Sequence, residues 1–208
     1  MIDSEETARG FCATRADAAG IGRLERFAAM LAEENERQNL VSSASLATVW
    51  QRHFADSLQL LDHVPHETAP WLDLGSGAGI PGLALACARP QTPVVLVESR
   101  KRRVEWLIRA AATLGLGECR VVGARLESVE SFPAGVITAR AFAPLGKLLQ
   151  LSARFSTRDT IWLLPKGRSA AQELAEQPPG VQQVFHVEQS CTDPEGGILI
   201  GQGTPQVR

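Results

Sequence analysis

Apolar residues in the first third of the chain recur at the spacing of amphipathic helices. Positions 21, 24, 27, 28 and 31 are apolar, and Asn39 is the expected end of that helix. Ser45 can cap a second helix, whose apolar face continues as far as Pro65. These patterns predict an α-helical N-terminal extension over residues 1–66.

The pattern changes after Pro70 to short apolar runs that alternate with helical stretches. Strands are predicted at 71–74, 93–98, 120–122, 135–139 and 160–164. Helices are predicted at 81–88, 101–114, 144–154 and 170–176. The runs 181–187 and 197–200 have no helix between them and are expected to pair antiparallel. We therefore predict an α/β fold over residues 67–208, in which a doubly wound, Rossmann-like, mostly parallel sheet ends in an antiparallel hairpin.

The composition is that of a globular protein with a core of its own. The 208 residues are 44% hydrophobic, with 21 Lys and Arg against 23 Asp and Glu. A chain of this length needs no disulfide or metal to stabilise its core. It has no apolar run near the roughly 20 residues of a membrane span and no secretory leader pattern, so we expect a cytoplasmic protein, and a monomer.

Cysteine and histidine spacing gives no sign of a metal site. The four cysteines and four histidines are scattered, without a Cys-x-x-Cys pair. Charge is less even: residues 98–109 hold five basic against two acidic side chains, and residues 137–168 hold six against one. Two basic stretches in one domain can form a surface that binds phosphates.

The strongest chemical signal is a glycine-rich segment between a predicted strand and a predicted helix. Gly75, Gly77, Gly79 and Gly82 fall within eight positions directly after Asp73. In doubly wound folds this turn faces the ligand crevice at the carboxyl edge of the sheet. The segment also fits the dinucleotide pattern Gly-x-Gly-x-x-Gly, so an NAD-dependent oxidoreductase is an alternative.

Three features favour S-adenosylmethionine over a dinucleotide. Pro81 removes an amide that would otherwise cradle a pyrophosphate, and the chain has no tyrosine to serve as a dehydrogenase acid. Asp73 suits a cofactor with a cationic amino-acid end. We expect Asp73 near the methionyl ammonium, the loop from Gly75 to Gly79 against the nucleoside, and Glu98 binding both ribose hydroxyls.

Several segments together resemble one protein family. They are Arg52-His53-Phe-Ala-Asp56-Ser-Leu, Asp73-Leu-Gly75-Ser-Gly77-Ala-Gly79-Ile80-Pro-Gly82, Leu96-Val-Glu98-Ser-Arg100-Lys101-Arg102, Arg140-Ala-Phe142-Ala-Pro144-Leu and Pro165-Lys166-Gly167. In this order, over residues 39–167, the sequence is similar to the bacterial ribosomal RNA small subunit methyltransferase G family, also called glucose-inhibited division protein B.

The resemblance implies a Rossmann-like enzyme that uses S-adenosylmethionine to methylate N7 of a guanosine in the decoding-region loop of 16S rRNA. It places Gly75 and Ile80 at the cofactor, Leu126 and Glu127 on its adenine side, and Arg140 beside the methyl donor. The chain departs from the family pattern at Glu98, where Asp is usual, at residues 133–135, where Phe-Asp is common, and in a tail after Gly197 that is poor in basic residues.

Other classes of methyl transfer lack their residues in this chain. Exocyclic amine methylation uses an Asn-Pro-Pro or Asp-Pro-Pro run, and pyrimidine carbon-5 methylation uses a cysteine next to a proline; neither pattern occurs. Guanine N7 has a free lone pair and no proton to remove, so positioning can supply most of the rate. We therefore expect no general base and assign Arg140 a positioning role in catalysis.

Candidate contacts to 16S rRNA, or to the small ribosomal subunit, are mostly basic. Phosphate contacts are expected from Arg100, Lys101, Arg102, Arg103, Lys166 and Arg168. Phe142 can stack on the target base. His53 and Asp56, three apart on one helical face, can brace the glycine loop or contact RNA. A non-catalytic RNA-binding assembly factor is a second alternative.

Overall fold

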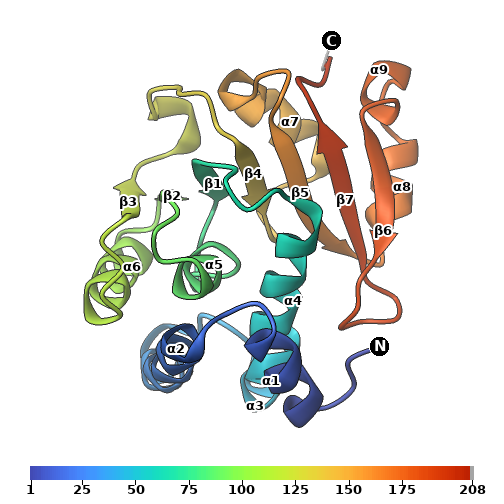
Figure 1. Cartoon of the computed structure of the whole chain (residues 1–208). Helices are drawn as coiled ribbons and strands as arrows, with labels where there is room; N and C mark the ends of the chain where they lie inside the picture. The colour runs from blue at the N-terminus through green and yellow to red at the C-terminus, as the bar shows by residue number, and fades with distance from the viewer. Residues whose placement is uncertain (207–208) are drawn as a thin grey trace.

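A seven-stranded sheet lies at the centre of the computed structural model, which describes residues 1–206. Its strands are β1 (Trp71–Leu74), β2 (Val94–Glu98), β3 (Cys119–Gly123), β4 (Val136–Ala139), β5 (Ile161–Gly167), β6 (Phe185–Gln189) and β7 (Gly197–Gln202). They are ordered β3-β2-β1-β4-β5-β7-β6, and β1 to β5 run parallel (Figure 1). β7 is antiparallel to both β5 and β6. The predicted fold, including its antiparallel hairpin, is confirmed.

Helices cover both faces of the sheet and fill the N-terminal extension. The extension contains α1 (Glu5–Ala13), α2 (Ala18–Gln38), α3 (Ser43–Ala47), the π-helix η1 (Trp50–Ala55), α4 (Asp56–Leu58) and the 3-10 helix η2 (Gln59–His63). The remaining helices are α5 (Gly82–Ala88), α6 (Lys101–Thr113), η3 (Leu126–Ser128), α7 (Leu145–Ser152), η4 (Ala153–Phe155), α8 (Ala170–Ala175) and α9 (Pro179–Gln182). Figure 1 shows α7 to α9 on one side of the sheet and the extension with α5 and α6 on the other.

Strand alternation divides the apolar core in two. In β1, Trp71 packs with α5, α6 and the extension, whereas Leu72 and Leu74 pack with the residues beneath α7. Because side chains alternate along a strand, Asp73 lies on the same face as Trp71, toward α5. This placement determines which loop the Asp73 carboxylate can support.

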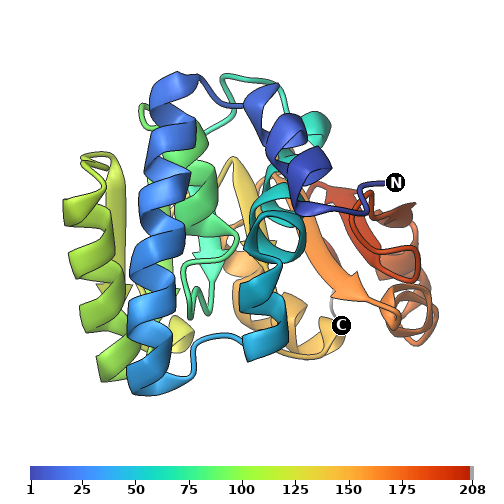
Figure 2. The same cartoon turned by 90° about the horizontal axis from the view of Figure 1, so that it is seen from below.

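The extension shares its core with the sheet. Phe27 of α2 stacks near Phe54 of η1 and Trp106 of α6, with ring centroids 5.5 and 6.3 Å apart. All three side chains are buried. Figure 2 shows α2 running alongside α6 and α5. The apolar core therefore continues across residue 66, and the division of the chain at that residue stays a prediction.

Three details of the extension and hairpin differ from the prediction. Ser42, not Ser45, caps α3, because its hydroxyl accepts the Ser45 N–H at 3.1 Å. The expected single helix up to Pro65 is wrong: α3 is followed by π, α and 3-10 turns. The strand expected from residue 181 begins at Phe185, since Pro179 occupies the first turn of the short helix α9. Asn39 does end α2, in the left-handed conformation.

Candidate active site

The parallel strands bring their following residues to one edge of the sheet. The registers of β1 with β2 and with β4 place Gly75, Glu98 and Arg140 directly after the last residue pairs. Glycine, carboxylate and guanidinium thus meet at the carboxyl edge, where doubly wound folds bind their ligands.

The glycine loop after β1 depends on residues without a side chain. Gly75 has a φ of +66°, and a Cβ there would lie 2.6 Å from Cδ2 of Phe142. A Cβ on Gly82, where α5 begins, would lie 2.6 Å from Oδ2 of Asp73. The Gly75 and Ser76 amides donate to the Val97 carbonyl at 2.8 and 3.1 Å. The loop is therefore tied to β2 and closely packed against β1.

Asp73 supports this loop from beneath. Its side chain is buried, and Oδ2 accepts the Gly82 N–H at 3.3 Å. Oδ1 is also buried and has no partner among the described residues. Burial raises the pKa of Asp73 to about 6. Asp73 is thus a buried carboxylate with one free acceptor atom, directly under the loop.

Glu98 is the acceptor for three main-chain amides. Oε1 accepts the N–H groups of Ser99 and Arg100 at 2.7 and 2.8 Å, and Oε2 accepts that of Gly77 at 3.1 Å. A carboxylate offers about four acceptor positions. Glu98 can therefore accept one ribose hydroxyl as it stands, and binding both, as the sequence led us to expect, would require one amide bond to be exchanged.

A smaller pocket of about 350 Å³ opens between the ends of β1, β2 and β3. Four of the predicted cofactor residues line it: Gly75, Glu98, Leu126 and Glu127. The others do not: Gly77 and Gly79 belong to the loop, Asp73 and Ile80 are buried, and Arg140 lines a second pocket. Cations also surround the smaller pocket, namely Arg100, Arg103, Arg125 and Lys147.

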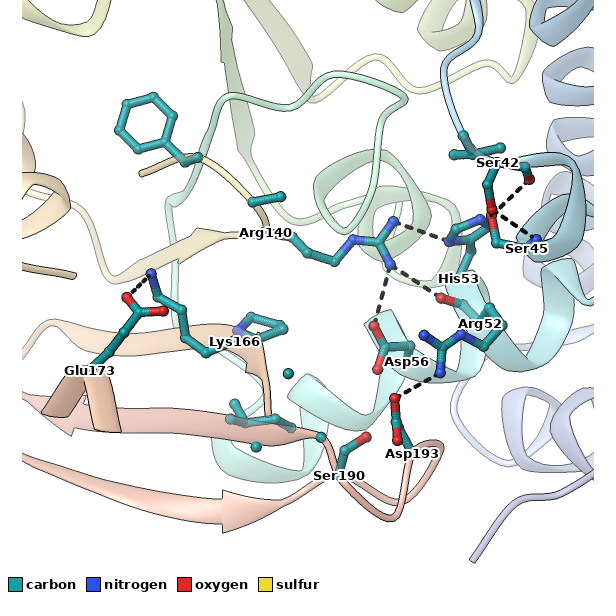
Figure 3. A pocket seen from close by; sticks show the side chains of 18 of the residues that line it. Ser42, Ser45, Arg52, His53, Asp56, Arg140, Lys166, Glu173, Ser190 and Asp193 are labelled. Atoms are coloured by element: carbon teal, nitrogen blue, oxygen red, sulfur yellow. Dashed lines mark hydrogen bonds and ion pairs between the residues drawn. The ribbon is translucent and has the colours of Figure 1, made fainter. Parts of the chain in front are cut away.

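The second, larger pocket has a volume of about 880 Å³ (Figure 3). It lies between the extension, the β4–α7 loop, the end of β5 and the β6–β7 loop. Residues 141–143 line both pockets and form the wall between them. Within this wall Ala141 has a φ of +55°, which is uncommon for a residue with a side chain, and the ring of Phe142 lies over Gly75. In the structure Phe142 thus covers the glycine loop.

Arg140 projects toward the extension in the larger pocket. Its Nη1 donates to the Arg52 carbonyl at 3.1 Å and to Oδ2 of Asp56 at 3.4 Å. Its Nη2 lies 3.1 Å from Nδ1 of His53 (Figure 3). Among the described residues no hydrogen bond joins His53 or Asp56 to the glycine loop, and both side chains contact Arg140 instead. Their contact with RNA, the other alternative, stays a prediction.

Comparison with known proteins assigns this site to a family. Residues 21–193 match the family model for rRNA small subunit methyltransferase G. The protein named ribosomal RNA small subunit methyltransferase G in Erythrobacter litoralis (strain HTCC2594) is 62% identical over 203 residues, covering 98% of each chain. Its namesake in Novosphingobium aromaticivorans is 53% identical, covering 89% of this chain and 82% of the relative. The chain belongs to the rRNA small subunit methyltransferase G family.

A solved structure agrees with the fold of this family member. The protein yhhF of Escherichia coli, assigned as a methyltransferase, aligns with a TM-score of 0.54 at 17% identity, covering 73% of this chain and 87% of its own. At this identity the likeness concerns the fold alone. The sequence match to the family is more specific, because it spans residues 21–193, a range that contains the glycine loop, Arg140 and the segment that holds Arg140.

The basic residues predicted for RNA contact lie in different surroundings in the structure. The Lys166 side chain is 9% exposed and donates to the Ala143 carbonyl at 2.9 Å and to Glu173 at 3.0 Å. Lys166 also lines the larger pocket, and its bond to Ala143 ties β5 to the wall between the pockets, so its predicted phosphate contact stays a prediction. Arg168 pairs with Glu195 on the surface.

The cluster at the start of α6 divides between the smaller pocket and the extension. Arg100 lines the pocket, and Arg103 does too, with its guanidinium 4.0 Å from Glu98. Arg102 donates to the Arg37 carbonyl at 2.7 Å, although its side chain remains exposed. Lys101 is exposed. These four residues are available at one rim, which keeps them as candidate RNA contacts.

Sequence reasoning did not identify the contacts that organise the larger pocket. Arg52 supplies a carbonyl to Arg140 and an ion pair to Asp193 at 2.9 Å, and Thr192 donates to Asp56 at 2.9 Å. Arg52 belongs to one of the segments that resemble the family, but a contact made by its main-chain carbonyl does not depend on the identity of its side chain.

Over residues 1–206 no cluster of three metal-binding side chains is found, and none of the helices described there is long and apolar enough to cross a membrane.

Proposed function

We propose that this family member transfers a methyl group from S-adenosylmethionine to N7 of a guanosine in the decoding-region (530) loop of 16S rRNA. The observation that carries the proposal is the pair of pockets at the carboxyl edge, separated only by residues 141–143. Such an arrangement suits a donor in one pocket and a nucleoside in the other. The names of the relatives supply the rRNA substrate class.

The residues of the smaller pocket fit the proposed cofactor. Glu98 retains an acceptor position for a ribose hydroxyl, Leu126 offers an apolar contact for adenine, and Glu127 lies beside it. The free Oδ1 of Asp73 places negative charge under the loop, where a cationic amino-acid end would be stabilised. Bound S-adenosylmethionine supplies an activated methyl group; the chain's own residues bind, orient and exclude water.

The larger pocket favours a reaction without proton removal. Its three carboxylates are each engaged by a cation: Asp56 by Arg140, Glu173 by Lys166 and Asp193 by Arg52. Burial, together with the charges of Arg140 and Arg52, lowers the pKa of His53 to about 3. A base of so low a pKa is ineffective near neutral pH. Guanine N7 needs no base, and positioning remains as the source of rate.

We expect the enzyme to act in the cytoplasm, as a monomer, on 16S rRNA or the small ribosomal subunit. The experiment incubates purified protein with labelled S-adenosylmethionine and 16S rRNA or small subunits, and maps the product by reverse transcription after N7-specific cleavage. Labelling at one guanosine of the decoding-region loop is expected. Labelling elsewhere would refute the site, and no labelling of either substrate would favour a non-catalytic RNA-binding role.

A thermal-shift measurement tests the cofactor separately. S-adenosylhomocysteine should raise the melting temperature, because a ligand that binds only the folded state stabilises it. NAD should leave it unchanged. The reverse pattern would indicate a dinucleotide enzyme.

A further inference from the structure

The guanidinium of Arg140 is held entirely by one short segment of the extension. The Arg52 carbonyl, the His53 ring and the Asp56 carboxylate all come from η1 and the residue that follows it. Arg140 itself lies on the other side of the larger pocket, at the end of β4 (Figure 3). The sheet supplies the cation, and the extension fixes its orientation.

The protonation state of His53 follows from this contact. A guanidinium can only donate, so Nδ1 of His53 must be the acceptor and the ring proton must be on Nε2. Only 4% of His53 is exposed, and Nε2 has no partner among the described residues. A buried donor without a partner is unfavourable for folding. The buried Nε2–H thus makes the folded state less stable, while Nδ1 is directed at Arg140.

Asp56 is fixed from two further directions. Its Oδ1 accepts hydrogen bonds from Oγ1 of Thr192 at 2.9 Å and from Nε2 of Gln59 at 3.0 Å. Its Oδ2 is thereby directed at Arg140. The β6–β7 loop and η2 both contribute to placing this one carboxylate oxygen.

The contacts leave part of the guanidinium free. Of its five N–H groups, two on Nη1 and one on Nη2 are engaged by the extension. The Nε–H and the second Nη2–H have no hydrogen-bond partner among residues 1–206. Two neighbouring N–H groups on a rigid plane suit a bidentate oxyanion, such as a carboxylate or a phosphate.

We propose that His53 and Asp56 are positioning residues for methyl transfer: they fix the plane of the Arg140 guanidinium so that its two free N–H groups meet an oxyanion at the boundary of the two pockets. This inference rests on the proposed function. A purely structural link between extension and sheet is the alternative, but ion pairs in partly buried sites are weak stabilisers compared with apolar packing.

The test separates activity from stability. His53→Leu removes the acceptor and the unpartnered Nε2 together, so the melting temperature should be maintained while kcat falls by about tenfold to a hundredfold. His53→Gln retains an acceptor oxygen and should recover part of that loss. Asp56→Asn preserves an oxygen for Thr192 and Gln59 and should lower kcat similarly. Asp62→Asn is the matched control, because it breaks the exposed ion pair with Arg15 elsewhere in the extension.

A double-mutant cycle supplies the decisive comparison. In an Arg140→Ala background, assayed by single turnover, His53→Leu and Asp56→Asn should change the rate by less than about twofold, since the guanidinium that they orient is gone. Arg140→Met replaces Arg140→Ala if the latter does not fold. Equal losses in both backgrounds, or a loss of kcat that follows the melting temperature, would overturn the proposal.

A readout without turnover keeps this test distinct from that of the proposed function. If the wild-type protein labels no RNA, the proposed function fails, and positioning is then judged from nitrogen NMR of the His53 ring. An Nε2–H tautomer whose Nδ1 resonance shifts in Arg140→Ala supports positioning. An Nδ1–H tautomer in the wild type contradicts it.

Discussion

Replacing Glu98 with glutamine alters the site while leaving its shape unchanged. The glutamine oxygen can still accept the Ser99 and Arg100 amides, at the 2.7 and 2.8 Å seen for Oε1. The new NH2 group then faces the Gly77 amide, which now donates to Oε2 at 3.1 Å. The reverse orientation is worse, because the NH2 group would confront two N–H groups instead of one.

The magnitude follows from these three bonds. A buried N–H left without an acceptor costs about 1–3 kcal/mol, and a hydrogen bond to a neutral acceptor is weaker by roughly 1 kcal/mol than one to a charged acceptor. With one amide left unsatisfied and two bonds weakened, the free energy of unfolding should drop by about 3–5 kcal/mol. The bond to a ribose hydroxyl loses its charge as well, so affinity for S-adenosylhomocysteine should fall by about 1–3 kcal/mol, or roughly fivefold to 150-fold.

Calorimetry with S-adenosylhomocysteine and urea unfolding measure the two effects independently. Glu118→Gln is the matched control, since Glu118 is exposed just before β3. A variant that loses stability yet binds the ligand as tightly as the wild type would show that Glu98 only organises the loop. An unchanged free energy of unfolding would refute the inference that the three hydrogen bonds from main-chain amides to Glu98 stabilise the fold.

Three further predictions concern charge. Because burial raises the pKa of Asp73 to about 6, above its unfolded value, its ionisation makes the folded state less stable as pH rises from 3.8 toward 6. The free energy of unfolding of Asp73→Asn, measured with urea relative to the wild type, should therefore rise by about 2–3 kcal/mol from pH 4 to pH 7.5. A difference from the wild type that is equal at both pH values would contradict this. Lys166→Met leaves Glu173 without its cation and should lower the free energy of unfolding by about 3 kcal/mol. The double variant Lys166→Met/Glu173→Leu should recover much of that loss. If Lys166→Met alone leaves the stability unchanged, the pair is unimportant for folding. RNA methylation should decline steeply between about 50 and 200 mM salt while S-adenosylhomocysteine affinity barely changes, and a salt-independent rate would exclude an electrostatic RNA contact.

The features of the fold that could be predicted are those that depend on short, local sequence patterns. Short apolar runs, four of the five followed by a helical pattern, predicted the first five strands to within three residues at each end. The glycine loop was predictable because positive φ and close packing at Gly75 and Gly82 restrict the residue type. The end of α2 was predictable for a related reason, since Asn39 tolerates the left-handed conformation.

The parts that could not be predicted depend on contacts that only the path of the folded chain brings about. Lys166 and Glu173 are seven positions apart but belong to β5 and α8, so only the fold shows that they pair. Glu98 was correctly placed at the carboxyl edge, yet its use by three amides depends on the path of the loop. Ser42 and Ser45 are equally suited to cap a helix, and the structure alone distinguishes them.

The π-helix η1 combines both difficulties: its turn is not visible in local patterns, and its side chains contact a residue distant in sequence. A six-residue turn that departs from the 3.6-residue period is invisible to a search for amphipathic helices, although such turns are frequent at functional sites. The spacing of His53 and Asp56 indicated that they share one helical face, but the residue that both contact, Arg140, lies more than 80 positions further along the chain. The orientation of the guanidinium in the larger pocket is therefore a property of the extension as much as of the sheet. It follows that substitutions within η1 should alter methyl transfer without changing a residue of the glycine loop or of the smaller pocket.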